Sequence, residues 1–161
     1  MMTQRYLSAV NLLLSGSALL IAILYFQNHL GLEACNLCLL QRAAMVAFVA
    51  VMFISLLHNR WAKLYGGLGL LAAGTGIAIA ARHVWLQSLP EDQVPACGPP
   101  MEFLIEAGVP WLEIIAQTLQ GSGNCAAVSW EIAGLSIPAL TLIVFVVLAL
   151  VSLLMVAKAR S

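Results

Sequence analysis

The stretch CNLCLLQRAAMVAFVAVMFISLL, residues 35–57, joins two cysteines to a long apolar segment. A helix needs about 20 apolar residues to cross the roughly 30 Å of hydrocarbon in a bilayer, and residues 39–57 come close to that length. The whole chain has the same character, since 62% of its 161 residues are hydrophobic and only 9% are charged. Soluble proteins carry much more charge. We therefore expect an integral membrane protein.

Four segments are long and apolar enough to span a bilayer: residues 7–27, 39–57, 64–81 and 137–157. Backbone polar groups must be paired inside lipid, and these segments are too continuously apolar for barrel strands, so we expect helices. The predicted fold is all-α, a polytopic four-transmembrane-helix bundle forming one membrane domain over residues 1–161. We expect the first segment to be retained, because its apolar run is too long for a signal peptide and no small-x-small cleavage site ends it.

The basic residues predict the orientation, because lysine and arginine accumulate in short cytoplasmic segments. Five of them would share one side of the membrane: Arg5, Arg60, Lys63, Lys158 and Arg160. Both termini would then be cytoplasmic. The opposite side would carry a short loop at residues 28–38 and a long second loop at residues 82–136. In a bacterium, these two loops would be periplasmic.

This orientation places all four cysteines outside the cytoplasm, where thiols can remain oxidised: Cys35, Cys38, Cys97 and Cys125. Four cysteines permit three pairings, and the sequence leaves the pairing open. A Cys97–Cys125 bridge would stabilise the long loop by restricting the unfolded chain. A Cys35–Cys38 bridge would close almost no loop, so it would add little stability. The Cys-x-x-Cys spacing is instead typical of thiol–disulfide exchange, which favours redox chemistry for this pair.

Cys38 falls in the expected first turn of the second helix, where unpaired amides and the helix dipole stabilise a thiolate. Arg42 follows one turn later on the same face, so its guanidinium can reach the sulfur or a molecule bound beside it. A simple interface arginine, whose charged group extends to the lipid headgroups, is an open alternative. Because an unpaired arginine in a membrane segment costs about 3 kcal/mol, Arg42 is also a functional candidate.

The third segment ends with AARHVWLQ, residues 80–87, on the same outer side. Interface anchoring would explain Arg82 and Trp85 one by one, and a solvated loop position would explain His83. Together with Arg42 they could line a site with apolar walls. Such a site would bind a lipid-soluble molecule with carbonyl oxygens and stabilise negative charge on it during reduction.

The long outer loop contains an amphipathic stretch at Pro110–Leu119. This stretch predicts a helix that either lies on the membrane surface or is buried against the bundle. Glycines and prolines flank it, so we expect Cys97 and Cys125 to lie on mobile segments. In the third apolar segment, small residues recur at every three or four positions and predict close helix packing: Gly66, Gly69, Ala73, Gly76 and Ala80.

At this point the sequence resembles a known family. Cys35-Asn-Leu-Cys38 with Arg42, after one transmembrane segment, and Cys97 with Cys125 in the second outer loop are similar to the DsbB family of disulfide-bond formation proteins. The resemblance also covers the chain length, the loop sizes and CAAVSWEIAGLSIP, residues 125–138. It implies a protein dithiol:quinone oxidoreductase of the bacterial inner membrane. That enzyme would reoxidise a periplasmic thioredoxin-fold oxidase of the DsbA type, in the relay that keeps the periplasm oxidising.

The resemblance also implies roles for the cysteines. Cys97 would form the mixed disulfide with the partner oxidase, and Cys125 would exchange with Cys35. Cys38 would pass the electrons to ubiquinone or menaquinone. The protein would act as a monomer surrounded by membrane lipid, and it would not bind nucleic acid.

Two residues match the family's quinone site by the same resemblance: Arg42, and His83 at the outer end of the third segment. Cys38 itself would complete that site. One departure is visible, because Ala34 and Asn36 stand where members often carry proline beside or within the first cysteine pair. This leaves the redox potential of the pair open.

Two other functions remain as alternatives. A four-span scaffold, similar to tetraspanins, would use Cys97–Cys125 as a structural bridge in its outer loop and would treat Cys35–Cys38 as incidental. A zinc site could use all four thiolates, although the second pair lacks the usual close spacing and an oxidising compartment works against free thiolates. The sequence contains no phosphate-binding loop, paired-carboxylate site or long basic patch, so nucleotide, glycosidase and nucleic-acid functions have no support.

Overall fold

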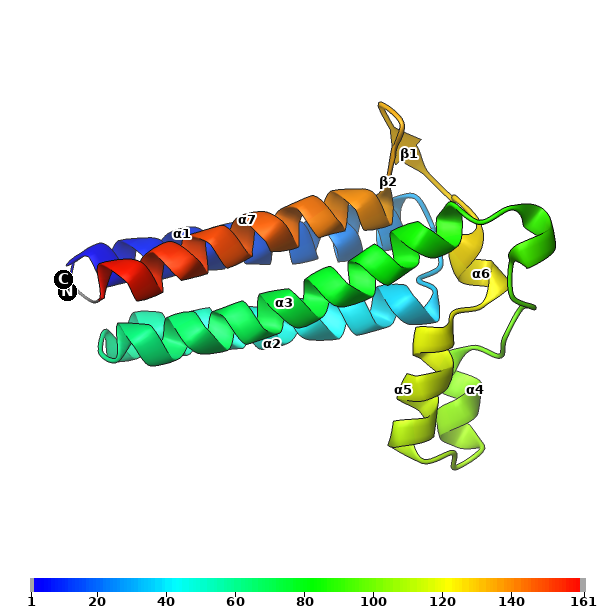
Figure 1. The fold of residues 1–161 in the computed structure, drawn as a ribbon, viewed down its shortest axis with the longest axis horizontal. Helices are drawn as coiled ribbons and strands as arrows, with labels where there is room; N and C mark the ends of the chain where they lie inside the picture. The colour runs from blue at the N-terminus through cyan, green and yellow to red at the C-terminus, as the bar shows by residue number, and fades with distance from the viewer. Residues whose placement is uncertain (1, 160–161) are drawn as a thin grey trace.

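The computed structural model describes residues 2–159. Within these residues, four helices are long and apolar enough to cross a membrane: Gln4–His29, Asn36–His58, Ala62–Gln87 and Ile137–Lys158. They lie side by side as a bundle (Figure 1). Each predicted span falls inside one of these helices, so the all-α four-helix fold class is confirmed.

The first spanning helix has two parts, α1 (Met2–Leu20) and the π-helix η1 (Ile21–His29). The other spanning helices are α2 (Asn36–His58), α3 (Ala62–Gln87) and α7 (Ile137–Lys158). We call the end of the bundle that carries the α3–α7 connection the cysteine end. The opposite end, where α1 begins and α7 ends, is the terminal end (Figure 1).

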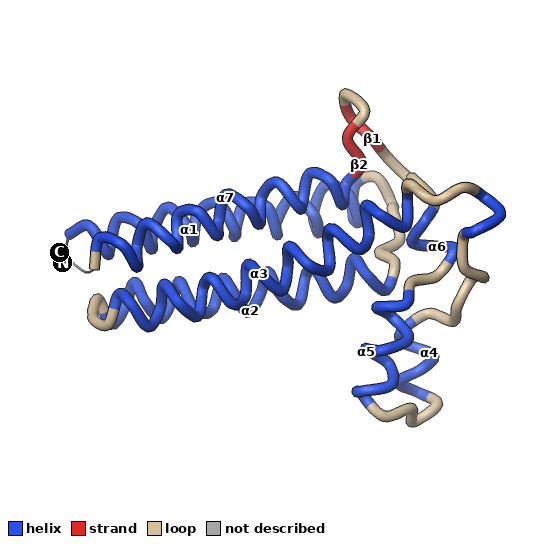
Figure 2. Tube along the Cα trace, viewed as in Figure 1, coloured by secondary structure: helices blue, strands red, loops and turns tan. Residues whose placement is uncertain are grey.

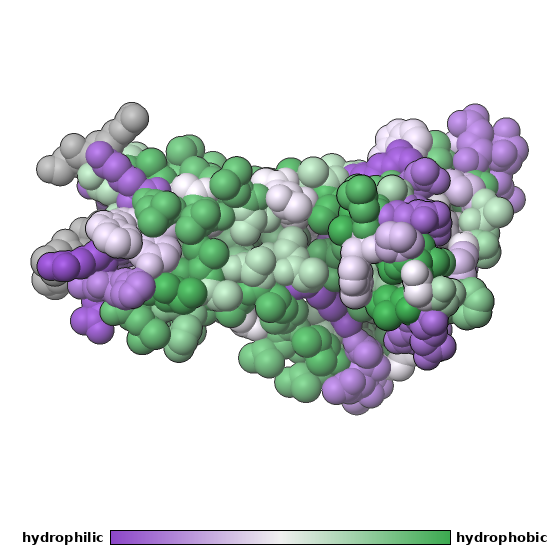
Figure 3. Space-filling view, turned by 90° about the horizontal axis from the view of Figure 1, so that it is seen from below, coloured by the Kyte–Doolittle hydropathy of each residue, from purple (hydrophilic) through white to green (hydrophobic). Residues whose placement is uncertain are grey.

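Small residues on α3 let this helix lie close to its neighbours. A Cβ atom added at Gly76 would overlap the Phe145 ring of α7, and one at Gly69 would overlap the end of Met52 on α2. The predicted small-residue packing is therefore confirmed at these positions. α3 and α7 form the most extensive helix pair of the bundle. Figure 3 shows the result on one face, where hydrophobic side chains cover the middle and hydrophilic ones gather towards the two ends.

Polar side chains in the bundle interior also join the helices. Ser8 Oγ on α1 lies 2.9 Å from Ser55 Oγ on α2, and the Asn11 amide donates to Ser152 Oγ on α7 over 3.2 Å. All four residues are fully buried. Hydrogen bonds of this kind replace the hydrophobic driving force that helices lack inside lipid.

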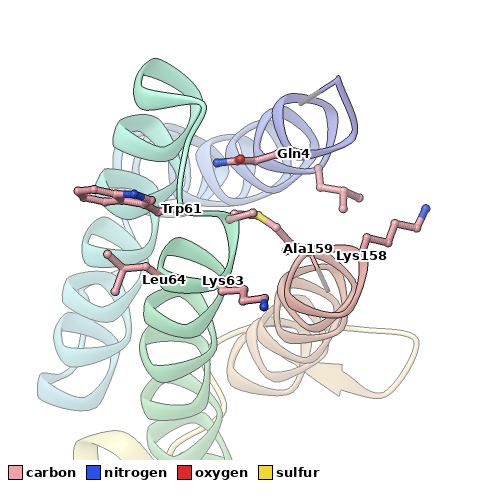
Figure 4. A pocket seen from close by; sticks show the side chains of 9 residues that line it. Gln4, Trp61, Lys63, Leu64, Lys158 and Ala159 are labelled. Carbon is pink, nitrogen blue, oxygen red and sulfur yellow. The ribbon is translucent and has the colours of Figure 1, made fainter. Parts of the chain in front are cut away.

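The terminal end collects basic residues, as the sequence predicts. Arg5, Arg60, Lys63 and Lys158 lie at helix ends there, while Arg160 lies outside the described residues. Figure 4 shows a pocket at this end, between the beginnings of α1 and α3 and the end of α7. It has a volume of about 590 Å³, and its walls include two lysines but no cysteine.

The cysteine end holds the long connection between α3 and α7. Its elements are η2 (Glu91–Gln93), α4 (Met101–Glu106), α5 (Trp111–Gln120), α6 (Gly123–Ala126), β1 (Glu131–Ile132) and β2 (Leu135–Ser136). The two strands pair antiparallel, with Glu131 opposite Ser136. Figures 1 and 2 show that α4 and α5 form a helical hairpin projecting sideways from the bundle.

The outer loops are shorter than the sequence predicts. α2 begins at Asn36, inside the predicted loop 28–38, and α3 continues to Gln87, inside the predicted loop 82–136. His83 therefore lies on a helix and not in a solvated loop. The apolar spans mark only the lipid-crossing part of each helix, and polar residues can extend the helix beyond it.

The predicted amphipathic helix is present as α5, with Pro110 at its N-cap. Ile114 and Thr118 are buried, whereas Trp111 and Leu112 are exposed. One face of α5 thus packs against the protein, and apolar side chains remain on the other face. The packed face fits a helix buried against the bundle, and the location on the membrane surface stays a prediction.

Candidate functional site

Cys35 and Cys38 are brought together by the start of α2. Cys35 is the N-cap residue, with extended backbone angles (φ −67°, ψ 165°), and its Sγ accepts a hydrogen bond from the Cys38 amide over 3.4 Å. The two sulfurs lie 3.0 Å apart, and both side chains are partly exposed. An N-cap acceptor is what the free amides of a first helical turn require. The two-residue spacing of the cysteines therefore produces this arrangement locally.

Arg42 is held between the first and second spanning helices. Its guanidinium donates to the side-chain oxygen of Gln27 and, over 3.1 Å, to the backbone oxygen of Ala22. Both acceptors belong to η1, and both are neutral. The guanidinium is therefore fixed in position by two neutral oxygen atoms.

A cavity of about 280 Å³ opens between the first spanning helix, α2 and α7, near the cysteine end. Cys38 and Arg42 both lie on its wall, next to Gln41. The other lining residues are mostly apolar and include Leu19, Phe26, Met45, Leu140 and Val144. The Glu33 carboxylate also lies on the wall, and the mostly apolar lining with Cys38 and Arg42 fits a flat apolar molecule that carries carbonyl oxygens.

His83 does not line this cavity and lies behind it, only 2% exposed. Its Nε2 is 3.0 Å from the backbone oxygen of Cys125 and 3.8 Å from Cys35 Sγ. Its Nδ1 is 3.0 Å from the side-chain nitrogen of Gln41. A carbonyl oxygen can only accept, so Nε2 carries the hydrogen, and Nδ1 of the neutral ring accepts from the Gln41 amide.

Gln41 therefore stands between His83 and the cavity. Sequence reasoning missed this residue, although a glutamine one position before Arg42 in an apolar helix was a signal that could have found it. Gln41 is buried, lines the cavity and bonds to His83. One buried hydrogen-bonded chain thus runs from the cavity wall to the backbone of Cys125.

Cys125 lies on the short helix α6, which packs against α3. Its side chain is 1% exposed and belongs to an apolar cluster with Leu37, Ile79 and Leu86, against which Cys35 also packs. The pKa of the Cys125 thiol is raised, first by a hydrogen bond with the Cys35 side chain and second by burial. Cys125 and Cys35 therefore pack into the same apolar cluster.

Cys97 is exposed and lies beside the same short helix. The Gly123 amide donates to the Ala96 carbonyl over 3.3 Å. A Cβ at Gly123 would come within 3.1 Å of Cys97 Sγ, so the missing side chain lets the two segments lie against each other. The expectation that both loop cysteines lie on mobile segments does not fit Cys125, because that side chain is packed into the cluster beneath α6.

Arg82 and Trp85 do not join Arg42, so that part of the predicted convergence is wrong. Arg82 donates to the backbone oxygens of Leu119 (3.2 Å) and Gln120 (3.0 Å), the last residues of α5. Its guanidinium lies 4.2 Å from the centre of the Trp85 ring. These contacts fasten the helical hairpin to α3. Carbonyl groups at the C-terminal end of a helix attract a cation, which explains the choice.

The zinc alternative drawn from the sequence uses all four cysteine thiolates, whereas the described residues group two cysteines with His83. Cys35 Sγ, Cys38 Sγ and His83 Nε2 lie within 4.8 Å of one another, and these are atom types that zinc binds. However, His83 Nε2 directs its hydrogen to the Cys125 carbonyl, so its lone pair is not available as a ligand in this arrangement. The geometry fits sulfur exchange better than metal binding.

Fold and site together define a class of protein: a multi-pass membrane protein whose four cysteines gather at one end of the bundle, suited to thiol–disulfide exchange. The model of the family described as "Disulfide bond formation protein DsbB" matches residues 4–155. The chain belongs to this family. It is therefore a disulfide-forming oxidoreductase, and the resemblance noted from the sequence is confirmed.

Curated relatives agree along nearly the whole chain. "Disulfide bond formation protein B" of Marinobacter nauticus is 39% identical over 163 residues, covering 99% of this chain and 96% of the relative. The protein of that name from Nitrosococcus oceani is 46% identical over 140 residues (84% and 82%). That of Xanthomonas euvesicatoria is 43% identical over 151 residues (91% and 87%). No solved structure matches the chain.

Proposed function

We propose that this protein is a quinone-dependent dithiol oxidase that reoxidises a soluble thioredoxin-fold oxidase of the DsbA type. One observation carries the proposal. Cys38 and Arg42 share the wall of an apolar cavity, while Cys35, next to Cys38, packs against the cluster that contains Cys125. Electrons can thus pass from an exposed cysteine to a lipid-facing cavity through neighbouring sulfurs. The scaffold alternative explains neither this packing nor the cavity.

The proposed location is the bacterial inner membrane, with both termini in the cytoplasm and the cysteine end in the periplasm. Support comes from the basic residues at the terminal end, since lysine and arginine favour the cytoplasmic side. The cysteines would then face the compartment in which a partner oxidase works and disulfides persist.

The first step uses the difference in exposure between the two loop cysteines. A thiolate of the reduced partner attacks Cys97 Sγ in a Cys97–Cys125 disulfide, because Cys97 is exposed and Cys125 is buried. A mixed disulfide forms between the partner and Cys97, and the electron pair of the broken bond leaves on Cys125. Exchange of this kind requires access to the attacked sulfur, and of the two loop cysteines only Cys97 is exposed.

The second step is internal. The Cys125 thiolate attacks Cys35 Sγ in a Cys35–Cys38 disulfide, forming a Cys35–Cys125 bond and leaving the electron pair on Cys38. Cys125 and Cys35 pack into the same apolar cluster, so the attack needs little movement. The Cys38 thiolate is stabilised by the first turn of α2 and by the charge on Arg42.

The cavity supplies the site for the electron acceptor, ubiquinone or menaquinone. When bound, a quinone provides a two-electron acceptor that takes up two protons. Arg42 would donate hydrogen bonds from its remaining N–H groups to a carbonyl oxygen and would stabilise negative charge there. Cys38 would face the ring, and the apolar wall would exclude water. His83 would act indirectly, by holding the Gln41 side chain in place at the cavity wall.

The test uses purified protein, a reduced thioredoxin-fold oxidase and either ubiquinone or menaquinone. Loss of partner thiols should depend on quinone, with two thiols lost for each quinol formed. The Cys38→Ser variant should form no quinol, although its Cys97 should still react with the partner. A Cys38→Ser variant with full activity would remove the assignment, and so would a wild-type protein whose reduced Cys35 and Cys38 are not reoxidised by any quinone offered.

A further inference from the structure

Asn36, which lies between the two cysteines of the Cys35–Cys38 pair, bonds to the segment that carries Cys97. Its side-chain nitrogen donates to the Pro99 carbonyl over 3.1 Å. Its side-chain oxygen accepts from the Met101 amide over 3.1 Å. Both ends of one amide side chain are therefore paired with the backbone of a segment more than sixty residues away.

The Cys97 segment has few hydrogen bonds of its own at this point. Pro99 and Pro100 lack an N–H group, and α4 begins at Met101 without a side-chain cap from its own sequence. The Met101 amide is among the free donors of a first helical turn. Asn36 satisfies this donor and pairs the adjacent carbonyl, so it holds residues 99–101 in place.

This pairing also fixes where Cys97 lies. Cys97 lies two residues before Pro99. On the N-terminal side of Cys97, the segment is held by the hydrogen bond from the Gly123 amide to the Ala96 carbonyl. The Cys97 backbone is thus fastened at two points, to α6 next to Cys125 and to the turn that carries Cys35 and Cys38. Release of Asn36 would leave only the attachment to α6.

We propose that Asn36 is a positioning residue that returns Cys97 to Cys125 during the relay. This rests on the proposed function, and it concerns the step that closes the cycle. After the first exchanges, Cys97 is bonded to the partner and Cys125 is bonded to Cys35. The second thiolate of the same partner molecule then attacks the partner's sulfur in the mixed disulfide. This forms the partner's disulfide and leaves the electron pair on Cys97.

The closing step then needs Cys97 at the right place. The Cys97 thiolate attacks Cys125 Sγ, which forms the Cys97–Cys125 bond, breaks the Cys35–Cys125 bond and leaves the electron pair on Cys35. Cys35 and Cys38 are then both reduced and can pass two electrons to the acceptor in the cavity. Because Cys125 is buried beside Cys35, Cys97 must be held against it for this attack to be fast.

The experiment follows the Cys35–Cys125 species by acid quenching, alkylation and mass mapping after wild-type or variant protein is mixed with reduced partner. Asn36→Ala should slow the decay of this species about thirtyfold, as expected for two lost hydrogen bonds of roughly 1 kcal/mol each. Its formation should keep the wild-type rate, because Cys125 and Cys35 remain in the same apolar cluster. A slower overall reaction without accumulation of this species would overturn the proposal.

A backbone variant tests the bond from its other end. Met101→Pro removes the amide donor at a first helical position, which tolerates proline, and Met101→Ala removes only the side chain. Met101→Pro should accumulate the Cys35–Cys125 species, while Met101→Ala should not. The double variant Asn36→Ala/Met101→Pro should slow decay by less than the product of the two single effects, because both act on the same contact. Fully multiplicative effects would overturn the assignment.

Gln117→Ala is the matched control. Gln117 is a polar residue near the same segment, but its side chain bonds only to Glu113 within α5. This variant should behave as wild type, and accumulation equal to that of Asn36→Ala would overturn the specific role of Asn36. If wild-type protein never forms the Cys35–Cys125 species and produces no quinol, the relay itself fails. If the wild type works and Asn36→Ala matches it, only the role of Asn36 fails.

Discussion

The two cysteine pairs are built in different ways. Cys35 and Cys38 are two residues apart on one helix turn and are joined by a local hydrogen bond. Cys97 and Cys125 come from distant parts of the long loop, and one is exposed while the other is buried. Cys38 of the first pair lines an apolar cavity, whereas Cys97 of the second pair is exposed on the protein surface.

This difference separates the two tasks of the protein. A helix start gives the first pair a fixed geometry and a thiolate beside Arg42, which suits an acceptor dissolved in the bilayer. In the proposed relay, the second pair offers exposed Cys97 to the partner and keeps Cys125 in the buried cluster beside Cys35, so the partner reacts at Cys97 first. Four experiments test whether the two cysteine pairs have separate roles, and they are given in order of decreasing effect.

The largest effect should come from Cys38→Ser. This variant should lower the rate of quinol formation on the order of a thousandfold or more, because it removes the sulfur on the cavity wall. Its Cys97 should still form a mixed disulfide with the partner at the wild-type rate. The measurement is quinol absorbance together with gel analysis of the trapped complex. Equal loss of both reactions would show that the pairs do not have separate tasks.

His83→Phe should expose Cys125. The variant leaves the Cys125 carbonyl and the Gln41 amide without their partner, which costs about 2 kcal/mol or roughly thirtyfold in local opening. Alkylation of Cys125 in the reduced protein should therefore speed up by about this factor. His29→Phe is the control, since His29 is exposed and contacts Tyr25 by ring stacking. Unchanged protection of Cys125 in His83→Phe would contradict the structural role.

Arg42→Gln should raise the KM for quinone about tenfold, because a charge-assisted hydrogen bond contributes roughly 1.5 kcal/mol or more. The reaction of Cys97 with the partner should be unchanged. Arg82→Gln is the matched control, since Arg82 binds the end of α5 and does not line the cavity. Steady-state kinetics with varied quinone separate the two. A larger KM effect for Arg82→Gln would place the quinone elsewhere.

The smallest effect concerns pH. The raised pKa of Cys125 means that the folded reduced protein favours the neutral thiol. This contribution to stability is complete below the ordinary thiol pKa of about 8.5 and is lost as the pH rises through the raised value.

Reduced wild type should therefore lose stability relative to Cys125→Ser only above about pH 8.5, by up to about 1 kcal/mol per pH unit. Thermal unfolding at several pH values measures this difference. A difference that is already lost near neutral pH would mean that Cys125 is not held as a buried neutral thiol.

The four helices could be predicted because hydropathy over some twenty residues is a strong local signal. Residues 137–157, for example, fall almost end to end on α7. The ends of the helices were less predictable. α3 runs on to Gln87, beyond its apolar span, and there Arg82 binds the carbonyl groups of α5, a contact that depends on the path of the loop.

The site was predictable in part for the same reason. Arg42 and Cys38 lie on one helix face by spacing alone, and the structure places both on the cavity wall. Gln41 and Asn36 were not recognised, since each looks like an ordinary polar residue until its partner is known. Their partners, His83 and the Pro99 segment, are 42 and 63 residues away.

The sequence by itself determined a membrane protein with four helices, a dithiol at a helix start and an arginine one turn further on. These features follow from hydropathy and helical spacing, which act over a few turns. Only the tertiary structure decided which sulfur meets Cys35, that His83 faces Cys125 and Gln41, and that Asn36 holds the Cys97 segment. Such contacts join residues far apart in the chain, and they form only once the helices have packed and the long loop has folded over their end.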